Sequence, residues 1–225
     1  MKVKLQSVTP NAEENIVEIA RVSSSRKDKK AKPEGLLNYL IKHKHFSPFE
    51  HSYLTLEIET SKAIGIQLIR HRSFTFQEFS QRYQDVKQLD GMFEKVELRK
   101  QCTDNRQSSS EIFDPMLKYE FPMNDESHFV DVPASQAVIS VLSQAEKVYN
   151  KLLEAGVARE QARMILPMTT KTKIYMTGSI RSWIHFFDLR DDEHAQKEIQ
   201  LIAKEGKNIF TQQFPIISNA LNYSK

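Results

Sequence analysis

The feature that most constrains this chain is an apolar run at 63–69 that leads directly into Arg70-His71-Arg72. A helix turns by about 100° per residue, so a helix continuing through this triplet would place Gln67, Arg70 and His71 on one face and Arg72 on the opposite side. A guanidinium offers a planar fork that matches phosphate oxygens. We therefore expect a site for an anion, most simply a phosphate, with the two arginines serving different partners. The alternative interpretation is a solvated basic helix end.

Composition restricts the class of protein. The chain has 225 residues, 40% of them hydrophobic and 27% charged, which is ordinary for one soluble globular domain. A net charge of +3 is too small to indicate a nucleic-acid partner. No apolar run reaches the length of a membrane span, and residues 1–4 lead into no signal-peptide core. The single cysteine, Cys102, excludes an internal disulfide framework and fits a reducing compartment. We therefore expect a cytoplasmic protein, in the host cytoplasm if the source is a virus.

Hydrophobic periodicity predicts an α+β fold. The clearest strand is 52–60, where Leu54, Leu56 and Ile58 alternate with polar residues. The chain has no Gly-x-Gly-x-x-Gly, so we expect no Rossmann turn. The prediction is a small, mostly antiparallel sheet flanked by helices. Further strands are expected at 3–8 and 169–177, and helices at 12–22, 33–43, 63–72, 131–155, 157–167, from 178, and from 191 to 214.

Other segments are less regular. The polar, basic stretch 23–30 is expected to be a loop. Phe79 and Tyr83 have helical spacing. Residues 85–130 are expected to form an insertion or lid, with weak strands around 92–98, in an otherwise single domain that spans 1–225.

A histidine-rich stretch raises a metal hypothesis. His43, His45 and His51 lie close together in the sequence with Glu50. Lys44 would repel a cation, and neither a His-Glu-x-x-His helix nor a cysteine pair is present. We therefore expect no metal site, and a metal hydrolase built on these histidines is kept only as an alternative.

The spacing within the arginine-rich stretch resembles a known signature. Arg-His-Arg is followed after seven residues by Ser80, with Glu78 before it and Arg82 after it. This pattern resembles the signature of flavin-dependent thymidylate synthases, which make thymidylate from deoxyuridylate with a reduced flavin. The resemblance implies the thymidylate synthase-complementing protein fold. Further similar blocks are His-x-x-Pro-Phe-Glu-His at 45–51, Gly-Val-x-Arg-Glu-x-Ala-Arg-x-x-Leu-Pro at 156–167, and Arg-Ser-x-x-x-Phe-x-x-Leu-Arg followed by His-Ala-Gln-x-Glu-Ile at 181–199.

The resemblance implies roles for particular residues. Arg190 would be the catalytic residue, which holds the pyrimidine of dUMP and favours its ionised ring. The resemblance implies no covalent enzyme nucleophile, so Ser80 is expected to bind substrate. The other expected dUMP contacts are Gln67, Arg70, Glu78, Gln81, Arg82 and Arg163. The expected FAD contacts are His45, Ser47, Arg70, His71, Arg72, Glu78, Ser179, Ile180, Arg181 and His185.

The resemblance also implies the reaction partners. Methylating C5 of uracil requires a one-carbon unit and a hydride, and no side chain supplies a hydride, so a cofactor must. Methylenetetrahydrofolate would donate the one-carbon unit, and NADPH would reduce FAD. The family is homotetrameric with sites shared between subunits, which implies that a dissociated monomer is inactive. The alternative function is a phosphate-binding nucleic-acid-binding protein, which predicts a salt-steep affinity and a colourless protein.

Overall fold

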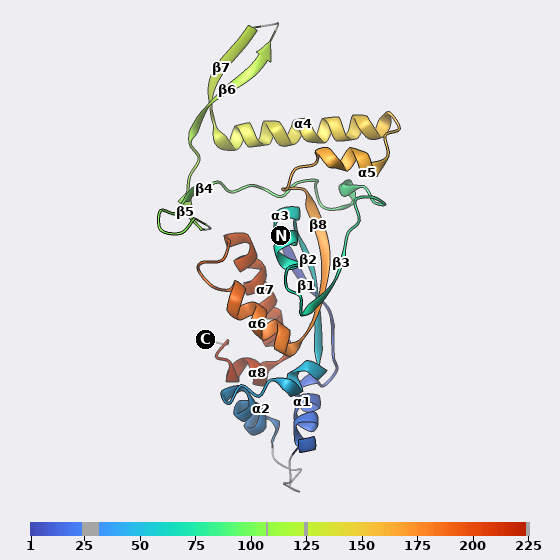
Figure 1. The fold of residues 1–225 in the computed structure, drawn as a ribbon, viewed down its shortest axis with the longest axis vertical. Coiled ribbons are helices and arrows are strands. Elements are labelled where there is room, and N and C mark those ends of the chain that lie inside the picture. The colour runs from blue at the N-terminus through green and yellow to red at the C-terminus, as the bar shows by residue number, and fades with distance from the viewer. Residues whose placement is uncertain (24–31, 107, 124–125, 224–225) are drawn as a thin grey trace. The chain divides into compact units, whose positions relative to one another are not determined.

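The computed structural model describes residues 1–23, 32–106, 108–123 and 126–223, and Figure 1 shows its elements. The chain divides into two compact units. The predicted insertion at 85–130 lies entirely within the second unit, and most of the predicted loop at 23–30 lies outside the described residues. The first unit contains Met1–Glu59, Ile64–Glu78 and Lys173–Lys225, and the second contains Thr60–Ala63 and Phe79–Thr172.

The first unit is built around a sheet of four strands in the order β1-β2-β8-β3. The β1–β2 and β3–β8 pairs are antiparallel, which confirms the predicted α+β class. α7 packs against β1, and α6 packs against α7 (Figure 1). The elements, some of which extend a few residues into the second unit, are β1 (Lys2–Val8), α1 (Ala12–Ala20), η1 (Arg21–Ser23), α2 (Pro33–Lys42), η2 (Ser47–His51), β2 (Tyr53–Ser61), α3 (Lys62–Leu68), β3 (Phe74–Glu78), β8 (Lys171–Ser179), α6 (Ile180–Arg190), α7 (Lys197–Gln213) and α8 (Pro215–Ala220).

The second unit combines two antiparallel ribbons with a long helix. β4 pairs with β5, and β6 pairs with β7 (Figure 1). Gly156 follows α4 with a φ of 85°, the left-handed conformation that ends many helices, so the predicted stop is confirmed. The elements are η3 (Val86–Gln88), β4 (Arg99–Gln101), β5 (Ser109–Ile112), β6 (Met116–Met123), β7 (Glu126–Pro133), α4 (Ala134–Glu154), α5 (Arg159–Ala162) and η4 (Arg163–Ile165). Its core contains Val86, Leu89, Met92, Tyr149 and Ala162.

Alternation along β2 buries one face of the sheet of the first unit. Leu54, Leu56 and Ile58 are at most 1% exposed, whereas the residues between them are half-buried. Trp183 of α6 is fully buried in the same core, and its indole N–H donates to the carbonyl of Leu54 at 2.9 Å. A buried indole N–H without an acceptor would be costly, so this bond fixes α6 against the sheet.

Three chain segments meet at one end of this sheet. Phe74 pairs with Gly178, so the start of β3 lies beside the end of β8. The N–H of Ile180 donates to the carbonyl of Ser52 at 2.9 Å, which joins the start of α6 to the start of β2. The strand register therefore brings together the chain after Arg70-His71-Arg72, the N-terminus of α6 and the end of η2.

α3 is shorter than predicted. It ends at Leu68, and the chain turns over the next residues before β3 begins at Phe74. A continuing helix would carry Phe74 away from its pairing with Gly178, so the helix stops where the sheet requires the chain to turn. The expectation that Arg70 and Arg72 lie on opposite faces of a helix is therefore wrong.

The prediction of helical structure from the spacing of Phe79 and Tyr83 is also wrong. Phe79 lies outside any helix, and Tyr83 lies in a turn at 81–83, in which its N–H donates to the carbonyl of Ser80 at 3.1 Å. The strands of the insertion are β4 to β7 rather than the weak strands expected around 92–98, where Phe93 makes only an isolated bridge to Thr170.

The last long helix begins later than predicted. It starts at Lys197 rather than at Asp191. The carboxylate of Asp192 accepts the backbone N–H of His194 at 2.8 Å, and such a local bond competes with helix formation. Within the described part of the chain, no helix combines the length and apolarity that a membrane crossing requires.

Replacing Gly178 by alanine is expected to destabilise the first unit. A Cβ at this position would lie 2.5 Å from the ring of Phe74. That ring cannot move away freely, because it packs edge-on against the buried Trp183 with ring centroids 4.8 Å apart. Overpacking of this kind typically costs about 1–3 kcal/mol. We therefore expect Gly178→Ala to lower the thermal unfolding midpoint, measured by circular dichroism. Gly35→Ala is the control, because a Cβ there meets nothing within 4 Å; an equal fall in both variants would contradict the packing argument.

Candidate active site

A hydrogen-bonded chain joins the three segments that meet at the end of the sheet. Glu50 of η2 accepts from the hydroxyl of Ser179 at 2.6 Å and from Nη1 of Arg181 at 3.0 Å. Ser179 also caps α6, because its Oγ accepts the N–H of Ser182 at 3.2 Å. The hydroxyl of Ser182 in turn donates to the carbonyl of Ser73 at 3.3 Å. These bonds hold η2, the N-terminus of α6 and the chain before β3 in one arrangement.

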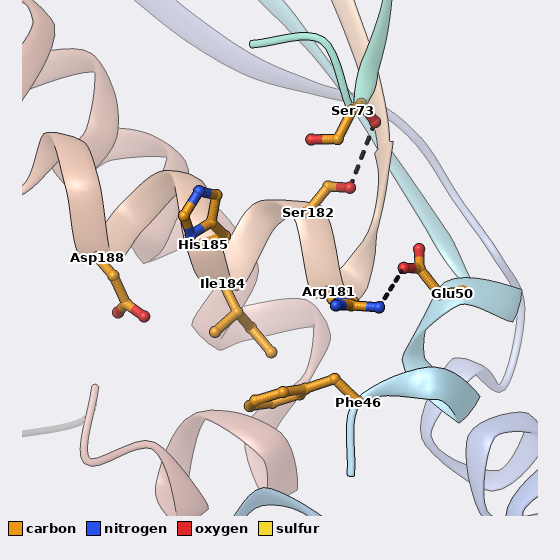
Figure 2. Close-up of a pocket in the computed structure, with 8 residues that line it drawn as sticks. All are labelled: Phe46, Glu50, Ser73, Arg181, Ser182, Ile184, His185 and Asp188. Atoms are coloured by element: carbon orange, nitrogen blue, oxygen red, sulfur yellow. Dashed lines mark hydrogen bonds and ion pairs between the residues drawn. The ribbon is translucent and has the colours of Figure 1, made fainter. Parts of the chain in front are cut away.

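A cavity of about 550 Å³ opens beside these segments. Figure 2 shows that α6 supplies most of its wall, with Arg181 near one end and Asp188 near the other. This volume is within the usual range for a small-molecule site. The cavity combines apolar walls with cationic and anionic groups, and it is lined by Phe46, Glu50, Ser73, Arg181, Ser182, Ile184, His185 and Asp188.

Arg190, at the C-terminal end of α6, contacts the histidine of the Arg-His-Arg triplet. Its Nε donates to Nε2 of His71 at 2.9 Å. The imidazole is held by two aromatic rings, with centroid distances of 5.0 Å to Phe186 and 6.3 Å to Phe74. Burial, with the nearby charge of Arg190, lowers the pKa of His71 from 6.5 to about 4. His71 is therefore a neutral acceptor at physiological pH and fixes the orientation of Arg190.

The other predicted residues of the first unit differ in their surroundings. Gln67 donates to the side-chain carbonyl of Gln196 at 2.6 Å, which links the triplet's neighbourhood to the start of α7. Arg70 and Arg72 are exposed, and the structure records no side-chain partner for either among the described residues. Glu78, the last residue of β3, is half-buried and has interactions within the structure.

Two of the predicted site residues in the second unit each have a buried polar side-chain atom. Nε2 of Gln81 and Nε of Arg163 are buried and have no hydrogen-bond partner among the described residues. Buried polar atoms are normally satisfied, so each of these two requires an explanation. Arg82 forms an ion pair with Glu160 at 3.3 Å, and both side chains are 52% exposed. The carbonyl of Ser80 accepts the backbone N–H groups of the following turn.

The histidine-rich stretch is exposed. His45 lies before η2, and its ring centroid is 6.0 Å from that of His43. Ser47 begins η2 and is exposed. Across the described residues, no cluster of three or more His, Cys, Asp or Glu side chains is arranged to hold a metal ion.

Sequence reasoning missed several residues of this region, and Ser73, Ser182 and Ile184 of the cavity lining are among them. Phe46 and Asp188 line the cavity, and Gln196 holds Gln67. The spacing of Asp188, seven residues after Arg181, places it on the same face of α6 and was available in the sequence. Nothing in the sequence indicated the contact with Gln196, because it depends on where α7 begins.

Comparison with known proteins assigns the chain to a protein family. A family model described as "Thymidylate synthase complementing protein" matches residues 4–216. The chain belongs to this family. A probable flavin-dependent thymidylate synthase of Paramecium bursaria Chlorella virus 1 is 40% identical over 231 residues, which cover 99% of this chain and 100% of the viral protein.

Cellular members of the family are also similar. The flavin-dependent thymidylate synthase of Synechocystis is 40% identical over 204 residues, 91% of this chain and 86% of that protein. The protein of the same name from Dictyostelium discoideum is 34% identical over 218 residues, 95% of this chain and 65% of that protein. The resemblance found in the sequence is confirmed, and the comparisons support it over the nucleic-acid-binding alternative.

Proposed function

We propose that this chain converts dUMP to dTMP, with methylenetetrahydrofolate as the one-carbon donor and FAD, reduced by NADPH, as the source of the hydride. The observation that carries the proposal is the bond between Arg190 and His71. It joins the Arg-His-Arg block to the last of the family-like blocks. It also occupies Nε of Arg190 and leaves both terminal nitrogens without a recorded side-chain partner among the described residues.

The proposed catalytic role of Arg190 is electrostatic. An arginine is charged at any working pH, and its two free terminal nitrogens can donate to a pyrimidine carbonyl and to the deprotonated ring nitrogen of the ionised pyrimidine. Ionisation of the ring would place negative charge on the pyrimidine and make C5 a better nucleophile toward the one-carbon unit, and these preorganised donors would stabilise that charge. Ser80 is assigned to binding, because a serine nucleophile needs a base to activate it and only Glu78 lies close to it in the sequence.

The nucleotide phosphate is assigned to arginines whose N–H groups are available to donate hydrogen bonds to it. The buried, unpartnered Nε of Arg163 and the exposed Arg70 support this assignment. The exposed ion pair of Arg82 with Glu160 contributes little stability, so a phosphate can replace the carboxylate. The amide of Gln81 has an unpartnered nitrogen for the same ligand. Gln67, Glu78 and Ser80 complete the proposed dUMP contacts.

The residues around the α6 cavity fit a flavin dinucleotide. FAD carries two phosphates and an apolar ring system, and the cavity offers the guanidinium of Arg181 and the imidazole of His185 beside Phe46 and Ile184. When bound, the flavin supplies the hydride that no side chain can supply. The chain's own residues bind and orient it. The other proposed FAD contacts are His45, Ser47, Arg70, His71, Arg72, Glu78, Ser179 and Ile180.

We also propose a homotetramer in the cytoplasm whose sites are shared between subunits. Apolar side chains that α4 leaves exposed support an interface, with Ile139 57% and Val141 53% exposed. The single cysteine, Cys102, fits a reducing compartment. That the two units act as one domain, with a lid at 85–130, stays a prediction.

An absorption spectrum tests the ligand assignment. Purified protein titrated with FAD is expected to develop a bound flavin spectrum, and adding dUMP is expected to shift that spectrum because both ligands occupy one site. Single-stranded DNA at low salt is the control ligand, for which we expect no shift. Failure to take up flavin under any condition would contradict the proposed function.

A further inference from the structure

The last turn of α6 makes contacts that the proposed function does not use. Asp191 caps this helix directly after Arg190, and its N–H donates to the carbonyl of Phe187 at 2.9 Å. Its Oδ2 accepts from Nζ of Lys207 at 2.7 Å, and Lys207 belongs to α7, which packs against α6 (Figure 1). The side chains of Asp191 and Lys207 are only 17% and 25% exposed. This ion pair is therefore better shielded from solvent than a surface pair, and it joins α7 to the residue beside Arg190.

A second contact holds Lys207 in place. Its Nζ lies 4.4 Å from the centroid of the Tyr223 ring, which is a cation–π contact. That ring packs edge-on against Phe187 of α6 and Phe210 of α7, with centroids 6.2 Å apart in both cases. The hydroxyl of Tyr223 donates to Oδ1 of Asp188 at 3.3 Å. The last turn of α6 is thus tied both to α7 and to the segment that follows α8.

The end of a helix is a place where a side chain is weakly held. The last four carbonyls of a helix have no partner within it, so the final turn frays readily. A carboxylate is also unfavourable there, because the C-terminal end of the helix dipole is negative. The ammonium of Lys207 offsets the charge of Asp191 and anchors the final turn. Lys204 contributes less, because its Nζ is 4.0 Å from Asp191 and its side chain is 53% exposed.

We propose that Lys207 is a positioning residue for Arg190. By binding Asp191 and Tyr223 it fixes the last turn of α6, and so keeps Nε of Arg190 within 2.9 Å of its acceptor on His71. This inference rests on the proposed function for the role of Arg190. It gives α7 and the segment after α8 a part in the reaction, although none of the proposed ligand contacts comes from them.

Turnover of Lys207 variants tests this role. Lys207→Met removes the cation and keeps much of the length of the side chain, so kcat is expected to fall about 10-fold, the scale of one hydrogen bond to a charged group. FAD affinity is expected to fall much less. Lys207→Arg keeps a cation for Asp191 and Tyr223 and is expected to recover most of the turnover. Lys204→Met is the matched control on the same helix and is expected to retain turnover. Melting curves verify that each variant is folded.

Two further measurements separate positioning from a general loss of stability. If Lys207 acts through Asp191, the double variant of Lys207→Met with Asp191→Asn loses no more turnover than either single variant. An NMR titration follows the ring of His71, whose low pKa depends in part on the nearby charge of Arg190. Withdrawal of Arg190 in Lys207→Met is expected to raise the midpoint of this titration from about 4, and Lys204→Met is expected to leave it unchanged.

The outcomes are distinct. An unchanged kcat or an unchanged His71 midpoint in Lys207→Met would overturn the proposal, as would a loss that Lys207→Arg does not recover or fully additive losses in the double variant. If the unmodified chain forms no dTMP, the proposed function itself fails. The His71 midpoint then still decides whether Lys207 positions Arg190, because that measurement requires no turnover.

Discussion

Replacing Arg190 by lysine is expected to reduce the turnover of dUMP by about 10²–10³-fold, the usual effect of removing a preorganised donor that stabilises transition-state charge. Lysine keeps the positive charge but loses the planar fork and the Nε that donates to His71. Arg190 is not among the proposed FAD contacts, and those of Arg181 and His185 lie earlier on α6, so FAD affinity is expected to fall much less than turnover does. Steady-state rates of dTMP formation and a parallel FAD titration measure the two effects.

The matched control for Arg190 is Lys204→Ala. Lys204 is an exposed cation on α7, whose side chain is 53% exposed and lies 4.0 Å from Asp191. We expect this variant to retain turnover. A loss of FAD binding in Arg190→Lys as large as the loss of turnover would show that the substitution disturbs the whole site, and the electrostatic role assigned to Arg190 would then be wrong.

Replacing His71 by leucine is expected to reduce kcat/KM for dUMP by about 10–100-fold, because Nε of Arg190 would lose its acceptor and a hydrogen bond to a charged group contributes about 1.5–3 kcal/mol. His71→Gln is the matched variant, since its amide oxygen can replace Nε2 as an acceptor. We expect glutamine to recover most of the activity. Equal activity of the two variants would contradict the positioning role.

The pH dependence of kcat/KM provides a second readout for His71. The pKa of this histidine is lowered to about 4, so it is neutral, and able to accept from Arg190, from about pH 5 upward. Protonation below that range would remove the acceptor and place a second charge beside the guanidinium. We therefore expect no acidic limb from His71 between pH 5 and 8, and an NMR titration of the ring should show no midpoint near 6.5. A midpoint at that value would mean that the imidazole is not held as the structure has it.

The sequence predicted those parts of the fold that depend on local pattern. Alternating residues identified β2, and Gly156 marked the end of α4. The end of α3 was not predictable in this way, because Leu68 is followed by residues that a helix would tolerate. It is set by the pairing of Phe74 with Gly178, a contact between residues more than a hundred positions apart.

The sequence likewise predicted only part of the site. The motifs indicated that Arg181, His185 and Arg190 matter, and the structure places all three on α6. The partners of these residues come from elsewhere: Glu50 for Arg181 and His71 for Arg190. Such pairings depend on the order of strands in the sheet, which no local pattern in the sequence encodes.

The most direct test of the central claim is formation of dTMP. The purified chain is incubated with dUMP, methylenetetrahydrofolate, FAD and NADPH, and the nucleotides are separated by chromatography. The account predicts dTMP, and it predicts that none forms when the flavin or the folate is left out. No dTMP from a folded, flavin-loaded protein, or dTMP that forms equally well without flavin, would contradict it.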